Sequence, residues 1–108
     1  MISTKQLIPA VIVIKPVSTA KADLETACRQ VAQITTEAVH NNIAIVDIAI
    51  TFQSSKDITK RIKSLTEHKG IQALLIYNAK QLFTTKEECS EFIADMADFY
   101  QIKVICYR

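Results

Sequence analysis

Two adjacent hydroxyl side chains, Ser18 and Thr19, stand at the point where this chain is best placed to do chemistry. They follow an apolar, β-branched run, Val11–Ile14, and a helix-breaking proline, Pro16, and they precede a segment with helical spacing. In an open α/β sheet, ligands and reacting groups gather where a strand passes into its helix. The hydroxyl pair therefore predicts that this is the working edge of a sheet.

Lys80 is a further candidate at this edge. If the strand order is 2-1-3-4, the carboxyl ends of the first and third strands meet, and Lys80 shares a rim with Ser18 and Thr19. Helices that begin near Thr19, Ser55 and Thr85 would add free amide groups, which attract anions. Ser18, Thr19 and Lys80 could thus form a weak phosphate or sulfate site. The alternative is that the hydroxyls cap their own helix, which is favoured because no glycine lets the backbone approach a ligand closely.

The composition fits one domain, spanning residues 1–108. Of these residues, 49% are hydrophobic and 22% are charged, and no linker, repeat or low-complexity tract divides them. No apolar run approaches the roughly 20 residues of a membrane helix. The N-terminus lacks a secretory signal pattern, and three cysteines without a close pair fit a reducing compartment. The protein is therefore predicted to be cytoplasmic.

The cysteines and histidines predict neither a disulfide nor a metal site. Cys28 and Cys89 fall on the apolar stripes of predicted helices and Cys106 on a strand, which are positions typical of small buried hydrophobes. The chain has no Cys-x-x-Cys and no His-x-x-x-His spacing. It also lacks the glycines that phosphate loops and dinucleotide-binding folds need after the first strand. We therefore expect no metal and no small-molecule cofactor.

Apolar spacing alternates between strand and helix periods along the chain. Strands are predicted over about Ala10 to Ile14, Ile43 to Ile50, Ile71 to Tyr77 and Ile102 to Tyr107, and helices over Lys21 to about His40, from Ser54 or Ser55 to Gly70, and from Thr85 onward. Such alternation implies right-handed crossovers between parallel strands. The expected fold class is α/β with three layers, in which helices cover both faces of a mostly parallel sheet of order 2-1-3-4.

The last predicted helix has a clear start and a clear apolar stripe. Thr85 and Glu88 have the spacing of a capping box, so the helix should begin at Thr85. The side chains expected to face the sheet are Cys89, Phe92, Ile93, Met96 and Phe99. We predict that Phe92 is buried.

Charge is unevenly distributed between two of the helices. Residues 56–69 carry five lysines and arginines against Asp57 and Glu67, whereas residues 86–98 carry five acids against Lys86. These are either two solvated helix faces or a complementary surface for self-association or for a charged protein partner. The net charge of +2 predicts only weak general affinity for DNA, because binding follows the number of phosphates neutralised.

Two segments resemble motifs of a known family. Residues Pro16–Thr19 (Pro-Val-Ser-Thr) stand where serine recombinases, the resolvases and DNA invertases, have Tyr-x-Arg-Val-Ser-Thr. Residues Lys80–Thr84 (Lys-Gln-Leu-Phe-Thr) stand where the family has Asp-Arg-Leu-x-Arg. The chain thus resembles a resolvase catalytic domain over nearly its whole length. The resemblance implies a resolvase-like fold and puts Ser18 at the position of the family's nucleophile, which becomes linked to a 5′ phosphate of DNA.

The charged residues of both motifs are replaced in this chain. Pro16 stands in place of an arginine, Gln81 and Thr84 in place of two more, and Lys80 in place of the aspartate. Arginine forks stabilise the negative charge of a phosphoryl transition state, and each lost donor costs about a hundredfold to a thousandfold in rate. Lys80 does not reproduce the bidentate geometry of an arginine. We therefore expect that strand cleavage is lost.

Three interpretations of function follow. The first is a degenerate, resolvase-like pseudoenzyme that binds a protein partner or a second copy of itself, and DNA only weakly. The second is a functional or partner-assisted serine recombinase domain that uses Ser18. The third is a receiver-like or flavodoxin-like interaction module, although Asn78 stands where a receiver would need an aspartate. The helix-turn-helix DNA-binding domain that follows the catalytic domain in the family has no counterpart in these residues.

Overall fold

The computed structural model describes residues 7–52 and 55–108, and Ser54, one of the two predicted helix-start residues, lies outside them. The elements along the chain are β1 (Ile8–Ile14), α1 (Lys21–His40), β2 (Ile43–Ile50), α2 (Ser55–Lys69), β3 (Ala73–Ile76), α3 (Ala79–Leu82), α4 (Lys86–Tyr100) and β4 (Lys103–Cys106). In this part of the chain, no helix combines the length and the apolar character needed to cross a lipid bilayer.

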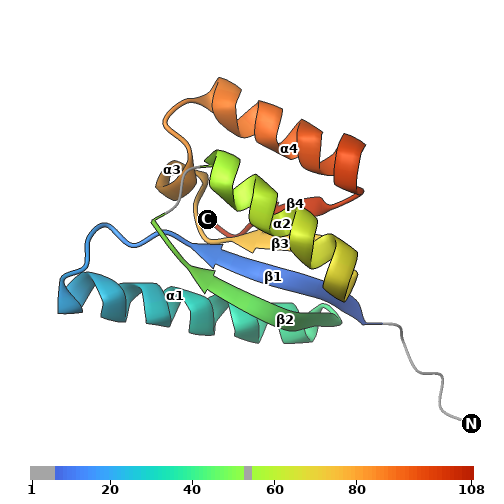
Figure 1. The fold of residues 1–108 in the computed structure, drawn as a ribbon. Coiled ribbons are helices and arrows are strands. Elements are labelled where there is room, and N and C mark those ends of the chain that lie inside the picture. Colours follow the sequence, from blue (N-terminus) through green and yellow to red (C-terminus); the bar gives the residue numbers. More distant parts are fainter. Residues whose placement is uncertain (1–6, 53–54) are drawn as a thin grey trace, which may run out of the picture.

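The four strands form one parallel sheet in the order β2-β1-β3-β4 (Figure 1). The first strand is central, since Ala10 pairs with Ala73 of β3 while Ile8 pairs with Ile43 of β2. Parallel neighbours require a crossover, which a helix supplies after β1 and after β2. The predicted α/β class and strand order are confirmed, and the carboxyl ends of β1 and β3 are neighbours.

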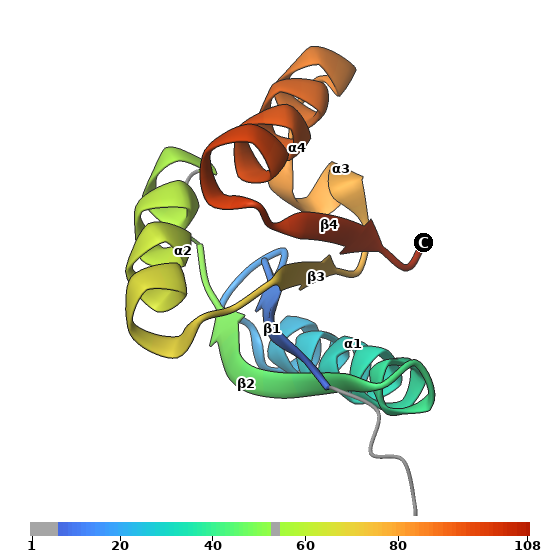
Figure 2. The ribbon, with the colours of Figure 1, turned by 90° about the vertical axis from the view of Figure 1, so that its right-hand side faces the viewer.

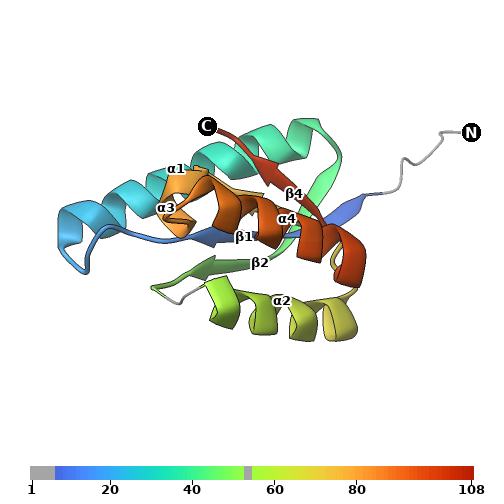
Figure 3. The same ribbon diagram turned by 90° about the horizontal axis from the view of Figure 1, so that it is seen from above.

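Helices cover both faces of the sheet (Figure 2). The side chains of β1 alternate between two hydrophobic cores, one on each face. On one face, α1 packs through Ala27 and Ile34 against the strand residue Ile12. On the other face, α2 and α4 lie side by side and bury Ile62 and Met96 completely (Figure 3). The predicted three-layer arrangement is therefore present.

Single residues fix the end of α2 and the start of α4 where the sequence predicts them. Gly70, the residue after α2, has a φ of +61°, a left-handed conformation that glycine adopts without steric cost. At the start of α4, the side chain of Thr85 accepts a hydrogen bond from the backbone N–H of Glu88 at 3.1 Å. Both predicted helix boundaries are thus confirmed.

Three features differ from the predictions. The short helix α3 was not predicted; it forms because the Asn78 side chain accepts the backbone N–H of Lys80 at 2.9 Å. Ile93 and Phe99 of α4 are 41% and 71% exposed, since Ile93 lies about a quarter turn around the helix from the buried Phe92 and Phe99 lies in its last turn. Cys28 and Cys106 are also exposed, since Cys28 lies about a quarter turn around α1 from the buried stripe and Cys106 ends the edge strand β4.

Candidate functional site

Ser18 lies in the loop that joins β1 to α1, beyond the carboxyl end of the strand (Figure 1). Pro16 is buried at the base of this loop, and Ser18 is half-buried. Oγ of Ser18 accepts the backbone N–H of Ala20 at 3.0 Å and donates its own proton to Oδ2 of Asp23 at 2.6 Å. Ala20 itself occupies the capping position of α1, without a side-chain cap. The Ser18 hydroxyl therefore closes a turn ahead of the helix instead of capping it.

Asp23 brings negative charge to the Ser18 hydroxyl. A hydrogen bond of 2.6 Å between a hydroxyl and a carboxylate is short and charge-assisted. Asp23 belongs to the first turn of α1, where the free helix amides favour an acidic side chain. This carboxylate is well placed to accept a proton from Ser18, and it repels an anion brought to the same hydroxyl.

Thr19 and Lys80 border different cavities. Thr19 lines a shallow hollow of about 550 Å³ along the first two turns of α1. Lys80 lines another, of about 510 Å³, where α3 and the start of α4 meet the end of the described chain. This second hollow also contains the cations Lys86 and Arg108 and the Thr85 hydroxyl. Neither cavity contains all three predicted anion ligands, and an anion site formed by Ser18, Thr19 and Lys80 together stays a prediction.

Gln81 and Thr84, which stand at the two arginine positions of the Asp-Arg-Leu-x-Arg motif, form local hydrogen bonds. Nε2 of Gln81 donates to Oε1 of Gln30 on α1 at 2.8 Å, and this contact joins α3 to α1. Oε1 of Gln81 is buried, and no residue in the described ranges gives it a hydrogen bond. Oγ1 of Thr84 donates to Oε2 of Glu88 at 3.0 Å. Neither position supplies positive charge for a phosphate.

A further cavity begins at the opposite, amino ends of the strands and extends along β4 to Tyr107. It measures about 670 Å³, and its lining residues are Ile8, Asn41, Ile43, Gln72, Ala73, Gln101, Lys103, Ile105 and Tyr107. Burial, and to a lesser extent the Glu37 carboxylate, raises the pKa of the Tyr107 phenol, which is therefore neutral at physiological pH. None of these residues is predicted from the sequence to form a site, because the polar side chains come one at a time from separate loops and from β4.

Asp23 is the site residue that sequence reasoning missed. The sequence marks it as an acid that suits the start of a helix, and nothing more. Its contact with Ser18 spans five positions across a turn and a helix start, and only the path of the backbone brings the two side chains together.

No protein-family model and no curated protein sequence matches this chain. Solved structures do resemble it, among them the following two. One is the C-terminal catalytic domain of ISC1926 TnpA, an IS607-like serine recombinase, with a TM-score of 0.69 and 22% identity over 94% of this chain and 68% of that one. The other is a resolvase family site-specific recombinase from Streptococcus pneumoniae, with a TM-score of 0.74 and 14% identity over 93% of this chain and 72% of that one. The chain has a resolvase-like fold.

The loop between β1 and α1 follows the central strand of this resolvase-like fold. In this resolvase-like domain the loop carries a serine bound to a carboxylate, and α3 carries a glutamine bound to another amide. The likeness to recombinase catalytic domains also favours the resolvase-like interpretation over the receiver-like or flavodoxin-like alternative.

Proposed function

We propose that this resolvase-like domain does not cleave DNA and acts as a binding module, for a protein partner or a second copy of itself. The observation that carries the proposal is the 2.6 Å hydrogen bond from the Ser18 hydroxyl to the Asp23 carboxylate. A serine that attacks a phosphodiester needs positive charge around the phosphate, and here the nearest hydrogen-bond partner of the hydroxyl is an anion.

The positions that hold arginine in the recombinase motifs support the same conclusion. They are occupied by Pro16, which has no donor, by Gln81, which bonds to Gln30, and by Thr84, which bonds to Glu88. Each preorganised donor that is lost from a charged transition state costs about a hundredfold to a thousandfold in rate. Three losses together remove useful catalysis.

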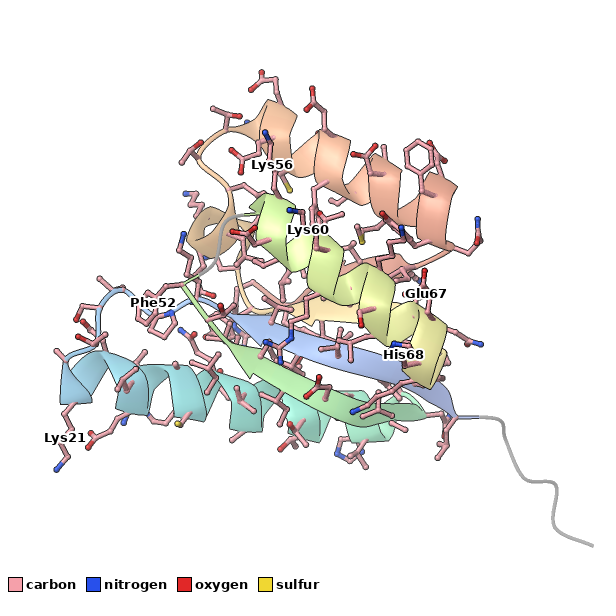
Figure 4. All side chains as sticks on the ribbon, viewed as in Figure 1. Lys21, Phe52, Lys56, Lys60, Glu67 and His68 are labelled. Atoms are coloured by element: carbon pink, nitrogen blue, oxygen red, sulfur yellow. The ribbon has the colours of Figure 1, made fainter. Side chains whose placement is uncertain are left out.

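A binding role agrees with the charge of the chain. The net charge of +2 gives little general attraction to DNA. The basic helix α2 lies beside the acidic helix α4 on one face of the sheet, and Lys56 and Lys60 mark the exposed side of α2 (Figure 4). Neighbouring surfaces of opposite sign steer protein partners more effectively than they attract a polyanion.

The same hydrogen bond supports a second candidate, a partner-assisted recombinase. A nucleophile is activated when its proton has an acceptor within about 2.6–3.2 Å, and Asp23 meets this condition for Ser18. Under this alternative, a partner supplies the arginines that are absent from the three motif positions, Pro16, Gln81 and Thr84.

An assay for covalent protein–DNA complexes tests the proposal. Purified protein is mixed in excess with supercoiled plasmid, denatured and separated, alongside the variants Ser18→Ala and Asp23→Asn. We expect no covalent complex with any of the three proteins. A phosphoserine linkage mapped to Ser18 overturns the proposal, and its loss in Asp23→Asn then identifies Asp23 as the proton acceptor of an active domain.

A further inference from the structure

Strand β2 forms one edge of the sheet, and part of its backbone faces away from β1. The N–H of Thr51, just after the strand, donates to the carbonyl of Ile14 at 2.9 Å, so Thr51 points towards β1. Because successive strand residues point in opposite directions, the N–H and C=O groups of Ile48 and Ile50 face outward. The N–H of Ile48 is bonded to Oδ1 of its neighbour Asp47 at 2.8 Å, which agrees with this orientation.

The side chains at this edge are large, apolar and exposed. Ile48, Ile50 and Phe52 are 44%, 42% and 47% exposed. Ile48 and Ile50 are in register with Ile12 and Ile14, whose side chains belong to the core under α1, so these residues point to the α1 face of the sheet. Figure 4 shows Phe52 at the tip of β2, near the start of α1. We call Ile48, Ile50 and Phe52 the β2 edge surface.

Soluble proteins usually protect such an edge with lysine or proline, with a bulge or by keeping the strand short. The opposite edge strand, β4, has only four residues and exposes Lys103. β2 has eight residues, and its bulge lies before the β2 edge surface, between the pairs of Ala10 and Val11. The one acid of β2, Asp47, forms an ion pair with Arg61 at 3.7 Å. The β2 edge surface itself carries no charge.

The sequence of this edge is complementary to itself. From Ile48 to Phe52 it reads Ile-Ala-Ile-Thr-Phe, so large and small residues alternate in the same order in both directions. In a twofold antiparallel pair centred on Ile50, Ile50 faces Ile50 of the other copy and Ile48 faces Phe52. The outward N–H and C=O groups of Ile50 then bond to their counterparts.

We propose that the β2 edge surface binds a second copy of this chain, with the two β2 strands antiparallel and the sheets joined into one. This inference rests on the proposed binding role and names the partner. The side chains of the seam are apolar, and the carboxylate at this edge, Asp47, keeps its hydrogen bond from the N–H of Ile48 and its ion pair with Arg61, so the pairing buries no uncompensated charge. The net charge of +2 per copy opposes association only weakly.

The seam, the paired residues Ile48 to Phe52 of the two copies, buries little surface area. The dimer is therefore weak, and its population rises with protein concentration. Interfaces below about 1,200 Å² of buried surface are typical of transient complexes. Leu24 and Cys28 are exposed on α1 and lie on the flank opposite Gln30, which bonds to α3, so they add apolar area on the β2 side of the helix. Sedimentation equilibrium from about 10 µM to about 1 mM covers the dissociation constants expected of such an interface.

The test compares Ile50→Lys and Ile48→Lys with the matched control Phe99→Lys. Phe99 is also an exposed apolar residue, 71% exposed, but it belongs to α4. We expect each β2 variant to raise the dimer dissociation constant by roughly 100-fold or more, because two unpaired ammonium groups would lie at the seam of each dimer. Phe99→Lys should leave the constant unchanged.

Amide hydrogen exchange of the unmodified protein gives a second readout. It needs no substitution, so it does not depend on whether a variant folds. The Ile50 amide should exchange more slowly as the protein concentration rises, whereas the control amide of Phe99 should not. A monomer at all concentrations overturns the proposal, as does a dimer that survives both β2 variants. A protein that stays monomeric until a foreign apolar strand is added overturns it in favour of another partner.

The result is separable from that of the DNA assay. A dimer that also forms a covalent complex through Ser18 would refute the proposed loss of cleavage and keep the β2 interface. A monomer that forms no such complex would refute the β2 interface and keep the proposed loss of cleavage.

Discussion

Replacement of Phe92 by alanine tests how α4 is attached to the sheet. Phe92 is 5% exposed, and its ring centroid lies 5.1 Å from that of Phe83, in the same core as Met96. Truncation removes nearly a whole buried ring and leaves a cavity, which in protein cores costs about 3–5 kcal/mol of unfolding free energy. Tilted aromatic pairs at this separation contribute roughly 1 kcal/mol to such losses, which favours the upper part of the range.

The assay is urea unfolding of Phe92→Ala beside Phe99→Ala. The two phenylalanines are seven positions apart on α4 and differ mainly in burial, since Phe99 is 71% exposed. For a slope near 2 kcal/mol per molar urea, Phe92→Ala should lower the midpoint by about 2 M, and Phe99→Ala by about 0.25 M or less. A loss below about 1 kcal/mol for Phe92→Ala, or equal losses for both variants, would refute the assigned packing.

Three further predictions concern the ends of helices and the thiols. Gly70→Ala should cost about 1 kcal/mol in thermal unfolding, because φ is +61° and alanine is strained there although no atom lies within 4 Å of its Cβ position. Gln101→Gly should have the opposite sign and stabilise the domain by about 0.5–1 kcal/mol, because Gln101 ends α4 with a φ of 54°; a lower melting temperature would contradict this. Cys89 should react with iodoacetamide more slowly than the exposed Cys28 at pH 8, as followed by mass spectrometry of peptides. Burial, and then the charges of Cys106 and Glu88, raise the pKa of the Cys89 thiol and so reduce its thiolate fraction; equal rates would count against this.

The fold could be predicted because its elements have strong local signals. Five consecutive apolar residues, Ala10–Ile14, are buried on both faces of the sheet, and such runs are typical of central parallel strands. Thr85 and Gly70 mark helix boundaries through the chemistry of single residues. The strand order then follows from few alternatives, because crossovers are right-handed and helices must cover both faces.

The exposed residues were predicted less well. Helical spacing places Phe99 and Cys28 in apolar stripes, but Cys28 lies about a quarter turn from the buried residues of α1, and Phe99 lies in the last turn of α4. The short helix α3 could not be predicted, because four residues are too few to show a periodic pattern and its start depends on the single Asn78 side chain.

The candidate site was predicted in position and not in its contacts. Ser18 does follow the central strand, as the sequence indicates. Its bond to Asp23, like that of Gln81 to Gln30, depends on the course of a loop and on the distance between α1 and α3. Such contacts join residues 5 and 51 positions apart and leave no pattern in a single sequence.

The central place of the first strand has a consequence for how the chain reaches its folded state. β1 can pair with β2 once the first crossover is complete, but its other edge waits for β3, and Ala10 must meet Ala73. Until then, a β1–α1–β2 unit has two open apolar edges, and one of them belongs to β1, whose residues Ala10–Ile14 are all buried in the folded protein. Intermediates with unpaired strand edges aggregate readily. Refolding yield should therefore fall with chain concentration even where the folded protein remains well dispersed.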